Sequence, residues 1–240
     1  MKEGLDAFIP AGGLGTRLRP LTLFYPKPTL WVKGKPLICY ALESCWQKCR
    51  LVFVSTYYKE EKVQRLLINP MFTNTLTILS DHGLINIGGS LIKHKEVIFN
   101  SSSSKHLIII PADHVLRQFP VDTIYQFHLK NNSDLTLILA AHKPYGDYVI
   151  VNKNQIVTRI VNKDESSENL PSYTGICLFK KSFLKKIISE SKMQKTGFDL
   201  TRSIIIPAIN RRLAYGYLLP ANSYWDDVGT WFRYIKNNFI

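Results

Sequence analysis

The sequence predicts an α/β fold, a doubly wound, mixed and mainly parallel sheet flanked by helices. Over about the first 140 residues, short apolar runs alternate with helix-like segments, which is typical of repeated strand–helix units. Runs such as 51–55 and 106–110 are apolar except at one end, Ser55 and His106, as expected of parallel strands buried on both faces. After Lys143 the pattern changes to closely spaced strands, which indicates added antiparallel pairing.

The first half begins with a strand and a long loop, 11–34. We expect strands at 5–10, 51–55, 75–79, 106–110 and 135–141, and helices at 36–49, 59–68, from about 91, and at 121–131. Pro36 stands in the first turn of its helix, where a missing N–H does no harm. Asn69-Pro70 ends the next helix, and a glycine-containing loop is expected at 80–90.

The second half begins with a hairpin that turns at Lys153-Asn154. The hairpin strands are expected at 148–151 and 156–161, further strands at 173–179, 213–219 and 223–225, and helices at 182–189, 199–210 and 230–238. No repeat or linker is evident, so the sequence predicts a single domain, 1–240.

Composition narrows the classes of partner. The net charge of +13 suits an anionic partner: a nucleotide, a sugar phosphate, nucleic acid or a membrane surface. Nucleic acid is not expected, because the basic residues are dispersed and form no long tract. No membrane partner is expected, since no apolar run approaches ~20 residues. The four cysteines form no CxxC pair and the start lacks a signal-peptide pattern, so we expect a cytoplasmic protein with reduced thiols.

The stretch 11–28, AGGLGTRLRPLTLFYPKP, carries the strongest functional signal. A glycine-rich turn after a first strand can direct backbone N–H groups at a phosphate. Arg17, Arg19 and Lys27 add positive charge at the same place. The patterns GxxxxGK[ST] and GxGxxG are both absent, so neither a P-loop nor a dinucleotide-binding turn is predicted.

Five motifs extend this signal along the chain. They are AGGLGTRLRPLT (11–22), PKP (26–28), GKPLI (34–38), PADHV (111–115) and YWDDVGT (224–230). On these motifs the chain resembles the sugar-1-phosphate nucleotidylyltransferases over essentially its whole length. The short, single-domain members that it resembles include the heptose-1-phosphate guanylyltransferases and the N-acetylmuramate-1-phosphate uridylyltransferases.

The resemblance implies a Rossmann-like fold of the nucleotide-diphospho-sugar transferase type. The nucleotide-binding half would be about 1–140 and the sugar-binding half about 141–240. The implied reaction is NTP + sugar 1-phosphate → NDP-sugar + pyrophosphate, with Mg²⁺ as cofactor. NTP and sugar 1-phosphate are therefore the expected partners, and a homo-oligomer is compatible with the sequence.

The glycine loop would bind the nucleotide and carry the catalytic cations. The nucleotide-binding candidates in the loop are Ala11, Gly12, Gly13, Gly15 and Thr16. Arg17 can offer a planar fork to the leaving pyrophosphate. Lys27, fixed between two prolines, can bridge the α-phosphate and the sugar phosphate. Positioning and charge neutralisation then supply most of the catalysis.

Asp113 and Asp227 are the candidate Mg²⁺ ligands. Asp113 follows a buried strand, and ligands of an open α/β sheet lie at the carboxyl ends of its strands. The family pattern W-x-D-x-G-T selects Asp227 over Asp226, for which we expect a solvated position or a supporting role behind the metal ligand.

Further candidates flank these motifs on the base side and the sugar side. Asp81, Gly88 and Gly89 lie in a loop that resembles the family segment holding the base and ribose, although Ile87 replaces a threonine there. Lys163 matches a family lysine that reaches the sugar phosphate, and an exposed hairpin lysine is the alternative. Gly175 matches a glycine that lets the sugar approach the sheet.

Several questions stay open. Val149 stands where the family commonly has a glycine, and it is expected either to narrow the sugar pocket or to reorient the loop. The sequence names neither the base nor the sugar. A phosphocholine-type cytidylyltransferase shares the loop, and a non-catalytic nucleotide-sugar sensor or RNA-binding protein would use the positive charge differently.

Overall fold

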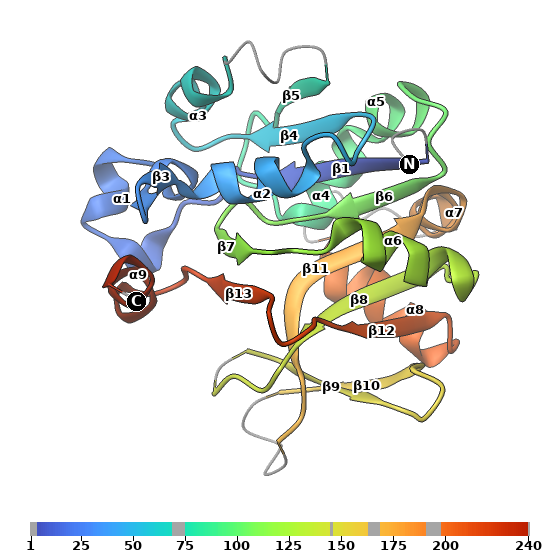
Figure 1. Ribbon diagram of the computed structural model, residues 1–240. Coiled ribbons are helices and arrows are strands. Elements are labelled where there is room, and N and C mark those ends of the chain that lie inside the picture. Colours follow the sequence, from blue (N-terminus) through green and yellow to red (C-terminus); the bar gives the residue numbers. More distant parts are fainter. Residues whose placement is uncertain (1–3, 69–74, 145, 163–168, 191–197, 240) are drawn as a thin grey trace.

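A mixed sheet forms the centre of the molecule (Figure 1). The computed structural model describes residues 4–68, 75–144, 146–162, 169–190 and 198–239. In these ranges a nine-stranded sheet has the order β10-β9-β11-β6-β1-β4-β5, with β8 added to β11 and β12 added to β8. Its strands are β1 (Leu5–Pro10), β4 (Val52–Thr56), β5 (Leu76–Ser80), β6 (His106–Ile109), β8 (Leu135–Ala140), β9 (Tyr148–Val151), β10 (Val157–Val161), β11 (Ser172–Lys180) and β12 (Ala214–Leu218).

The sheet is parallel in its first half and becomes antiparallel at β11. Strands β5, β4, β1 and β6 all pair in parallel, as the continuous apolar runs predict. Strand β11 runs antiparallel to both β6 and β8, and β9 and β10 form the predicted antiparallel hairpin. The predicted doubly wound, mixed α/β fold is confirmed.

Alternate side chains of the central strands enter two separate cores. In β1, Ala7 and Ile9 face the core covered by α2 (Leu37–Cys45), α3 (Glu60–Leu67) and α6 (Val121–Lys130). Phe8 faces the opposite core, which α4 (Ile87–Lys93), α5 (Lys95–Asn100), α7 (Lys181–Glu190) and α8 (Ile206–Asn210) cover. Because both faces are covered, the edge at which the parallel strands end is left for ligands.

Two short sheets lie outside the central sheet. Strand β2 (Trp31–Val32) pairs with β3 (Lys35–Pro36), and β7 (His114–Arg117) pairs with β13 (Tyr224–Asp227). The remaining helices are α1 (Leu21–Phe24) and α9 (Trp231–Phe239), which lie near each other at one end of the molecule (Figure 1). No helix in the described ranges has the length and apolar character needed to cross a membrane.

Four sequence expectations need correction. The helix predicted over 36–49 ends at Cys45, and the one expected from about 91 begins at Ile87. Strand β7 was not predicted, because His114–Arg117 follows a strand end and a turn directly. The helix predicted over 199–210 begins with a π-helical turn, Thr201–Ile205.

Candidate active site

One cavity of about 490 Å³ lies at the carboxyl edge of the parallel strands. Its wall is formed by the residues that follow β1, β5 and β6 and by Ser55 near the end of β4, together with parts of β11 and the 199–201 segment. The lining residues include Ala11, Gly12, Gly13, Gly15, Thr16, Arg17, Lys27, Ser55, Asp81, Asn86, Ser90, Asp113, Tyr173, Gly175, Asp199 and Gly229. The cavity therefore brings most of the candidates from both halves of the sequence together.

The glycine loop is held in shape by contacts at Gly15. Gly15 has φ +63°, and the Thr22 hydroxyl donates a hydrogen bond to its carbonyl oxygen at 2.9 Å. A Cβ at Gly15 would lie 2.9 Å from Thr22 Cγ2 and 3.2 Å from Lys27 Cβ. Gly13 has no atom within 4 Å of the corresponding position, so its backbone lies open to the cavity. This geometry suits a close approach of phosphate to backbone N–H groups.

Lys27 lies between two carboxylates. Its Nζ donates a short hydrogen bond to Asp113 Oδ2 and lies 3.7 Å from Asp227 Oδ1. The pairing of β7 with β13, which the sequence did not predict, brings Asp113 and Asp227 close together. It places Asp227 opposite His114, and Val228 N donates a hydrogen bond to the Asp113 carbonyl oxygen at 3.0 Å. Two aspartates that are far apart in sequence thus share one cationic neighbour.

Charge dominates the ionisation of Asp113. Burial raises the pKa of its carboxyl, but the charge and hydrogen bond of Lys27, with a contribution from the adjacent His114, hold that pKa well below its usual range. Burial also lowers the pKa of His114, which lies edge-on to the Trp225 ring at 5.9 Å. Asp113 is therefore ionised at neutral pH and can bind a cation.

Arg233 divides the two oxygens of Asp227 into different roles. Its Nη1 donates to Asp227 Oδ2 at 3.0 Å, whereas Oδ1 is buried without a hydrogen-bond partner among the described residues. Asp226 is not solvated, as one of our expectations had it. It is fully buried, and Arg233 and Asn237 donate hydrogen bonds to it.

These carboxylates fit a Mg²⁺ ion. Mg²⁺ takes one or two protein carboxylates and completes its shell with phosphate oxygens and water. Asp227 Oδ1 is an unsatisfied buried acceptor, and Asp113 Oδ2 is already bound to a cation, Lys27. The described ranges contain no group of three or more His, Cys, Asp or Glu side chains suited to a metal. Among these residues, therefore, no second metal site is formed by protein ligands alone.

Asp81 is buried in the wall of the cavity beside the glycine loop. Its Oδ1 accepts a hydrogen bond from Ser90 Oγ at 2.8 Å and lies 2.9 Å from His94 Nε2. A Cβ on Gly12 would lie 3.3 Å from Oδ2, so this second oxygen is next to the glycine loop. Asp81 therefore lines the cavity, and its predicted contact with a base and ribose stays a prediction.

Gly88 and Gly89 do not line the cavity. They lie in the first turn of α4, where Asn86 Oδ1 accepts a hydrogen bond from Gly89 N at 2.8 Å. A Cβ on Gly88 would lie 2.4 Å from the Phe198 carbonyl oxygen. Helix packing, rather than contact with a base, explains Gly88.

Another wall of the cavity is formed by β11 and the 199–201 segment. Gly175 has φ +76° and lines the cavity beside Tyr173, which is two residues earlier on the same strand. Val149 is fully buried in the core covered by α7 and α8, so it does not narrow the cavity as expected. Lys163 lies outside the described residues.

Sequence reasoning missed several residues of the site. Arg233 was missed because it is on a different element from Asp227 and carries no motif of its own. Asp199 lines the cavity from a segment that gave no functional signal in the sequence. Asn86 and Tyr173 also line it; they lie next to candidates, in the 80–90 loop and beside Gly175, but were not themselves singled out. The period-2 spacing of Tyr173 from Gly175 puts both on one face of the strand and could have indicated Tyr173.

Comparison with known proteins identifies the family. The model of the family described as nucleotidyl transferase matches residues 6–239. The chain belongs to the nucleotidyl transferase family. Among curated relatives, a mannose-1-phosphate guanylyltransferase catalytic subunit beta from Drosophila melanogaster is 25% identical over 233 residues, which are 95% of this chain and 60% of the relative. A glucose-1-phosphate adenylyltransferase 2 from Vibrio parahaemolyticus is 26% identical over 265 residues, covering 96% and 64%.

The nucleotidyl transferase family is also reflected in the fold. A crystal structure of a Bacillus anthracis protein assigned as a glucose-1-phosphate thymidylyltransferase, in complex with sucrose, superimposes with a TM-score of 0.83. It is 18% identical, and the match covers 98% of this chain and 94% of that one. The chain spans less than two thirds of the length of the two curated relatives above.

Proposed function

We propose that this protein transfers a nucleotidyl group from an NTP to a sugar 1-phosphate, giving an NDP-sugar and pyrophosphate. The observation that carries the proposal is the position of Lys27 between Asp113 and Asp227, at the end of an open glycine loop. Family membership supports the transfer of a nucleotidyl group, and the curated relatives are named for transfer to sugar 1-phosphates.

The nucleotide would lie along the glycine loop. Backbone N–H groups of the loop around Gly13 would donate to the phosphates, and Arg17 would bind the leaving pyrophosphate at the mouth of the cavity. Asp81 would face the base and ribose from the other side of Gly12. The α-phosphorus would then lie near Lys27, between the nucleotide and sugar sides.

The sugar phosphate would enter from the β11 side. Gly175, with its left-handed backbone and no side chain, leaves room there for the sugar ring. A phosphate oxygen would form the new bond to the α-phosphorus as the α–β bridging bond breaks. No general base is needed, because a phosphate monoester with a second pKa near 6 is already ionised at neutral pH.

Asp113 and Asp227 would hold the Mg²⁺ that the family resemblance implies. When bound, this ion would offset the negative charge of the reacting phosphates. Lys27 would then leave the Asp113 carboxylate and donate to the α-phosphate and the incoming phosphate. In such transfers, fixed charged groups that neutralise the reacting phosphates supply most of the rate enhancement.

The test is pyrophosphate release measured across a panel of NTPs and sugar 1-phosphates. GTP with mannose 1-phosphate and ATP with glucose 1-phosphate are the first pairs, after the named relatives. Lys27→Ala and Asp113→Asn are expected to lose at least about 100-fold in kcat/KM. Lys33→Ala removes an exposed lysine six positions away and is the matched control.

Three outcomes would refute the proposal. If Lys27→Ala released pyrophosphate as fast as the wild type, the loop would have been given the wrong role. Turnover restricted to CTP with phosphocholine would indicate the cytidylyltransferase alternative. RNA binding that falls steeply with salt, with no turnover of any NTP, would indicate a non-catalytic protein.

A further inference from the structure

Helix α9 turns its apolar side to solvent and its polar side to the protein. Arg233 and Asn237 are buried, and both donate hydrogen bonds to Asp226. Phe232 and Phe239, in contrast, are 72% and 84% exposed. A surface helix normally buries its apolar stripe against the core. The folding of this domain therefore does not account for the apolar stripe of α9.

The exposed residues of α9 form a continuous stripe. At ~3.6 residues per turn, Trp231, Phe232, Ile235 and Phe239 fall within about 100° of the helix circumference. The buried positions 233 and 237 lie on the opposite side. This arrangement is typical of an amphipathic helix whose apolar face binds a partner.

The stripe continues onto α1 and β2. Trp231 Nε1 donates to the Arg19 carbonyl at 3.0 Å, and the Tyr234 hydroxyl donates to the Trp31 carbonyl at 3.1 Å, so these segments lie side by side. We call the exposed apolar residues of this region the α1–α9 face: Leu23, Phe24, Tyr25, Trp31, Trp231, Phe232, Ile235 and Phe239. Large contiguous apolar patches on a protein surface mark interaction sites.

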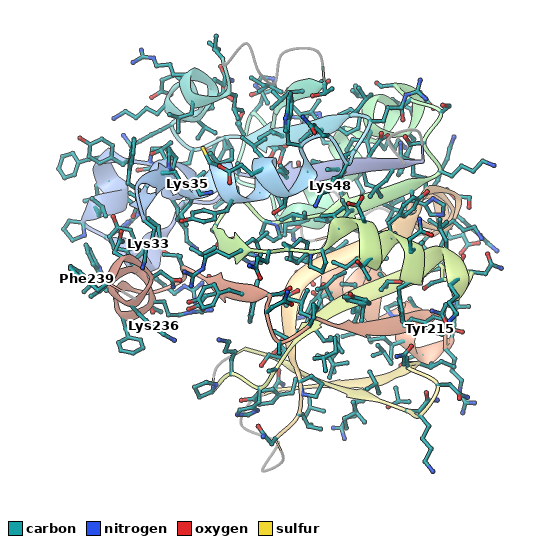
Figure 2. All side chains as sticks on the ribbon, in the orientation of Figure 1. Lys33, Lys35, Lys48, Tyr215, Lys236 and Phe239 are labelled. Carbon is teal, nitrogen blue, oxygen red and sulfur yellow. The ribbon has the colours of Figure 1, made fainter. Side chains whose placement is uncertain are left out.

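Around the α1–α9 face the charge is positive. Segments 11–35 and 228–240 contain no Asp or Glu. Apart from the buried Lys27 and Arg233, the basic residues of these segments are Arg17, Arg19, Lys33, Lys35 and Lys236. Figure 2 shows Lys33 and Lys236 beside Phe239 at the end of the molecule where α9 lies. The nearby Glu43 is paired with Lys35.

We propose that the α1–α9 face docks on the surface of an anionic phospholipid membrane. Lysines and arginines around the face would be attracted to anionic headgroups, and Phe232 and Phe239 would enter the acyl boundary. Tryptophan and tyrosine, present at Trp31, Trp231 and Tyr25, are the residue types enriched at membrane interfaces. Our expectation of no membrane partner rested on the lack of a spanning segment, which surface docking does not need.

A second copy of the chain fits this face less well. A symmetric contact would place the same basic residues opposite each other, and neither 11–35 nor 228–240 offers a carboxylate to answer them. Like charges brought together across an interface oppose association. Charge complementarity thus favours an anionic surface over self-association.

The test is co-flotation of the whole protein with vesicles, of phosphatidylcholine alone and of phosphatidylcholine with phosphatidylglycerol at about 70:30. A protein of pI ≈ 9.6 will show some charge-driven binding to the anionic vesicles, so the decisive comparison is between variants. Phe232→Ser/Phe239→Ser is expected to lower the partition coefficient on anionic vesicles by about tenfold or more. Its pyrophosphate release without vesicles should equal that of the wild type.

Ile68→Ser/Leu218→Ser is the matched control, because it removes two exposed apolar side chains from other surfaces. It should bind the anionic vesicles as the wild type does. Equal binding by the two double variants would overturn the proposal and leave only general charge attraction. A second result would also overturn the proposal: the wild type binds neither kind of vesicle but forms dimers in sedimentation velocity, and Phe232→Ser/Phe239→Ser abolishes these dimers.

Discussion

Arg233 Nη1 donates a hydrogen bond to Asp227 Oδ2 at 3.0 Å, which leaves Oδ1 as the free oxygen of that carboxylate. The same guanidinium holds the buried Asp226 through Nε and Nη2. One planar group therefore fixes the orientation of the proposed Mg²⁺ ligand and neutralises the charge behind it. A lysine has no such fork and cannot make these contacts together.

Arg233→Lys is expected to weaken the use of Mg²⁺. Groups that orient a metal ligand typically contribute about 10- to 100-fold in metal affinity or activity. We expect a comparable rise in the Mg²⁺ concentration that gives half-maximal activity, and a stability loss of about 1–3 kcal/mol from the poorly satisfied Asp226. The Mg²⁺ requirement is measured by titrating the activity with Mg²⁺, and the stability loss is measured by urea unfolding.

Lys236→Gln serves as the control on the same helix, since Lys236 is outside the carboxylate network. An unchanged Mg²⁺ requirement in Arg233→Lys, together with the stability loss, would assign Arg233 a purely structural role.

The central strands could be predicted from the sequence because each carries its own evidence. Strands such as β1 and β6 are apolar except at Asp6 and His106, and burial on both faces explains that composition. Strand β7 could not be predicted in this way, because its partner β13 is about 110 residues later and the pairing is tertiary. The start of α4 was hidden by Gly88 and Gly89, which have low helix propensity.

The residues of the site also differ in whether the sequence alone could indicate them. The glycine loop and the two aspartates stand out as local motifs, whereas Arg233, Asp199 and Asn86 depend on which segments the fold brings together. Gly88 lies outside the lining of the cavity, and its packing against Phe198 accounts for a glycine there. Motifs therefore indicated the chemistry better than they indicated the walls of the cavity.

Lys27→Met is expected to separate Mg²⁺ binding from catalysis. In the free protein Lys27 holds the position between Asp113 and Asp227 that a metal would take. Removing this charge should cost at least about 100-fold in activity. It should also lower the Mg²⁺ concentration that half-maximally raises Tm by about tenfold, because two carboxylates are left without a cation.

Thermal unfolding over a range of Mg²⁺ concentrations, without nucleotide, measures this effect. Lys33→Met is the matched variant and should behave as the wild type. A weaker Mg²⁺ response in Lys27→Met would mean that the two aspartates do not hold the ion.

Gly13 and Gly15 should respond differently to alanine. Gly15→Ala places a Cβ 2.9 Å from Thr22 Cγ2 at a φ of +63°, which should destabilise the protein by about 1–2 kcal/mol and weaken NTP binding. Gly13→Ala meets no atom within 4 Å, so its Tm should equal that of the wild type. Its NTP affinity, measured by calorimetry, should still fall about tenfold if phosphate approaches that backbone. Wild-type affinity in Gly13→Ala would place the phosphates elsewhere.

His128 should make the fold sensitive to acid. Its ring is buried, its Nε2 has no hydrogen-bond partner in the described ranges, and Nδ1 lies 2.8 Å from Thr136 Oγ1. Burial, with help from the nearby His106 and Lys180, lowers the pKa of His128 to about 3. In the unfolded chain the pKa of histidine is about 6.5.

Between these two pH values the unfolded chain binds a proton that the folded protein cannot accept. The free energy of unfolding should therefore fall as the pH falls below about 6.5, by up to about 1.4 kcal/mol per pH unit from this group. Urea unfolding at pH 7.5 and 5.5 measures the loss, which His128→Gln should reduce. His142→Gln, at an exposed histidine, should leave the loss unchanged. A loss in His128→Gln as large as in the wild type would assign the acid sensitivity to other groups.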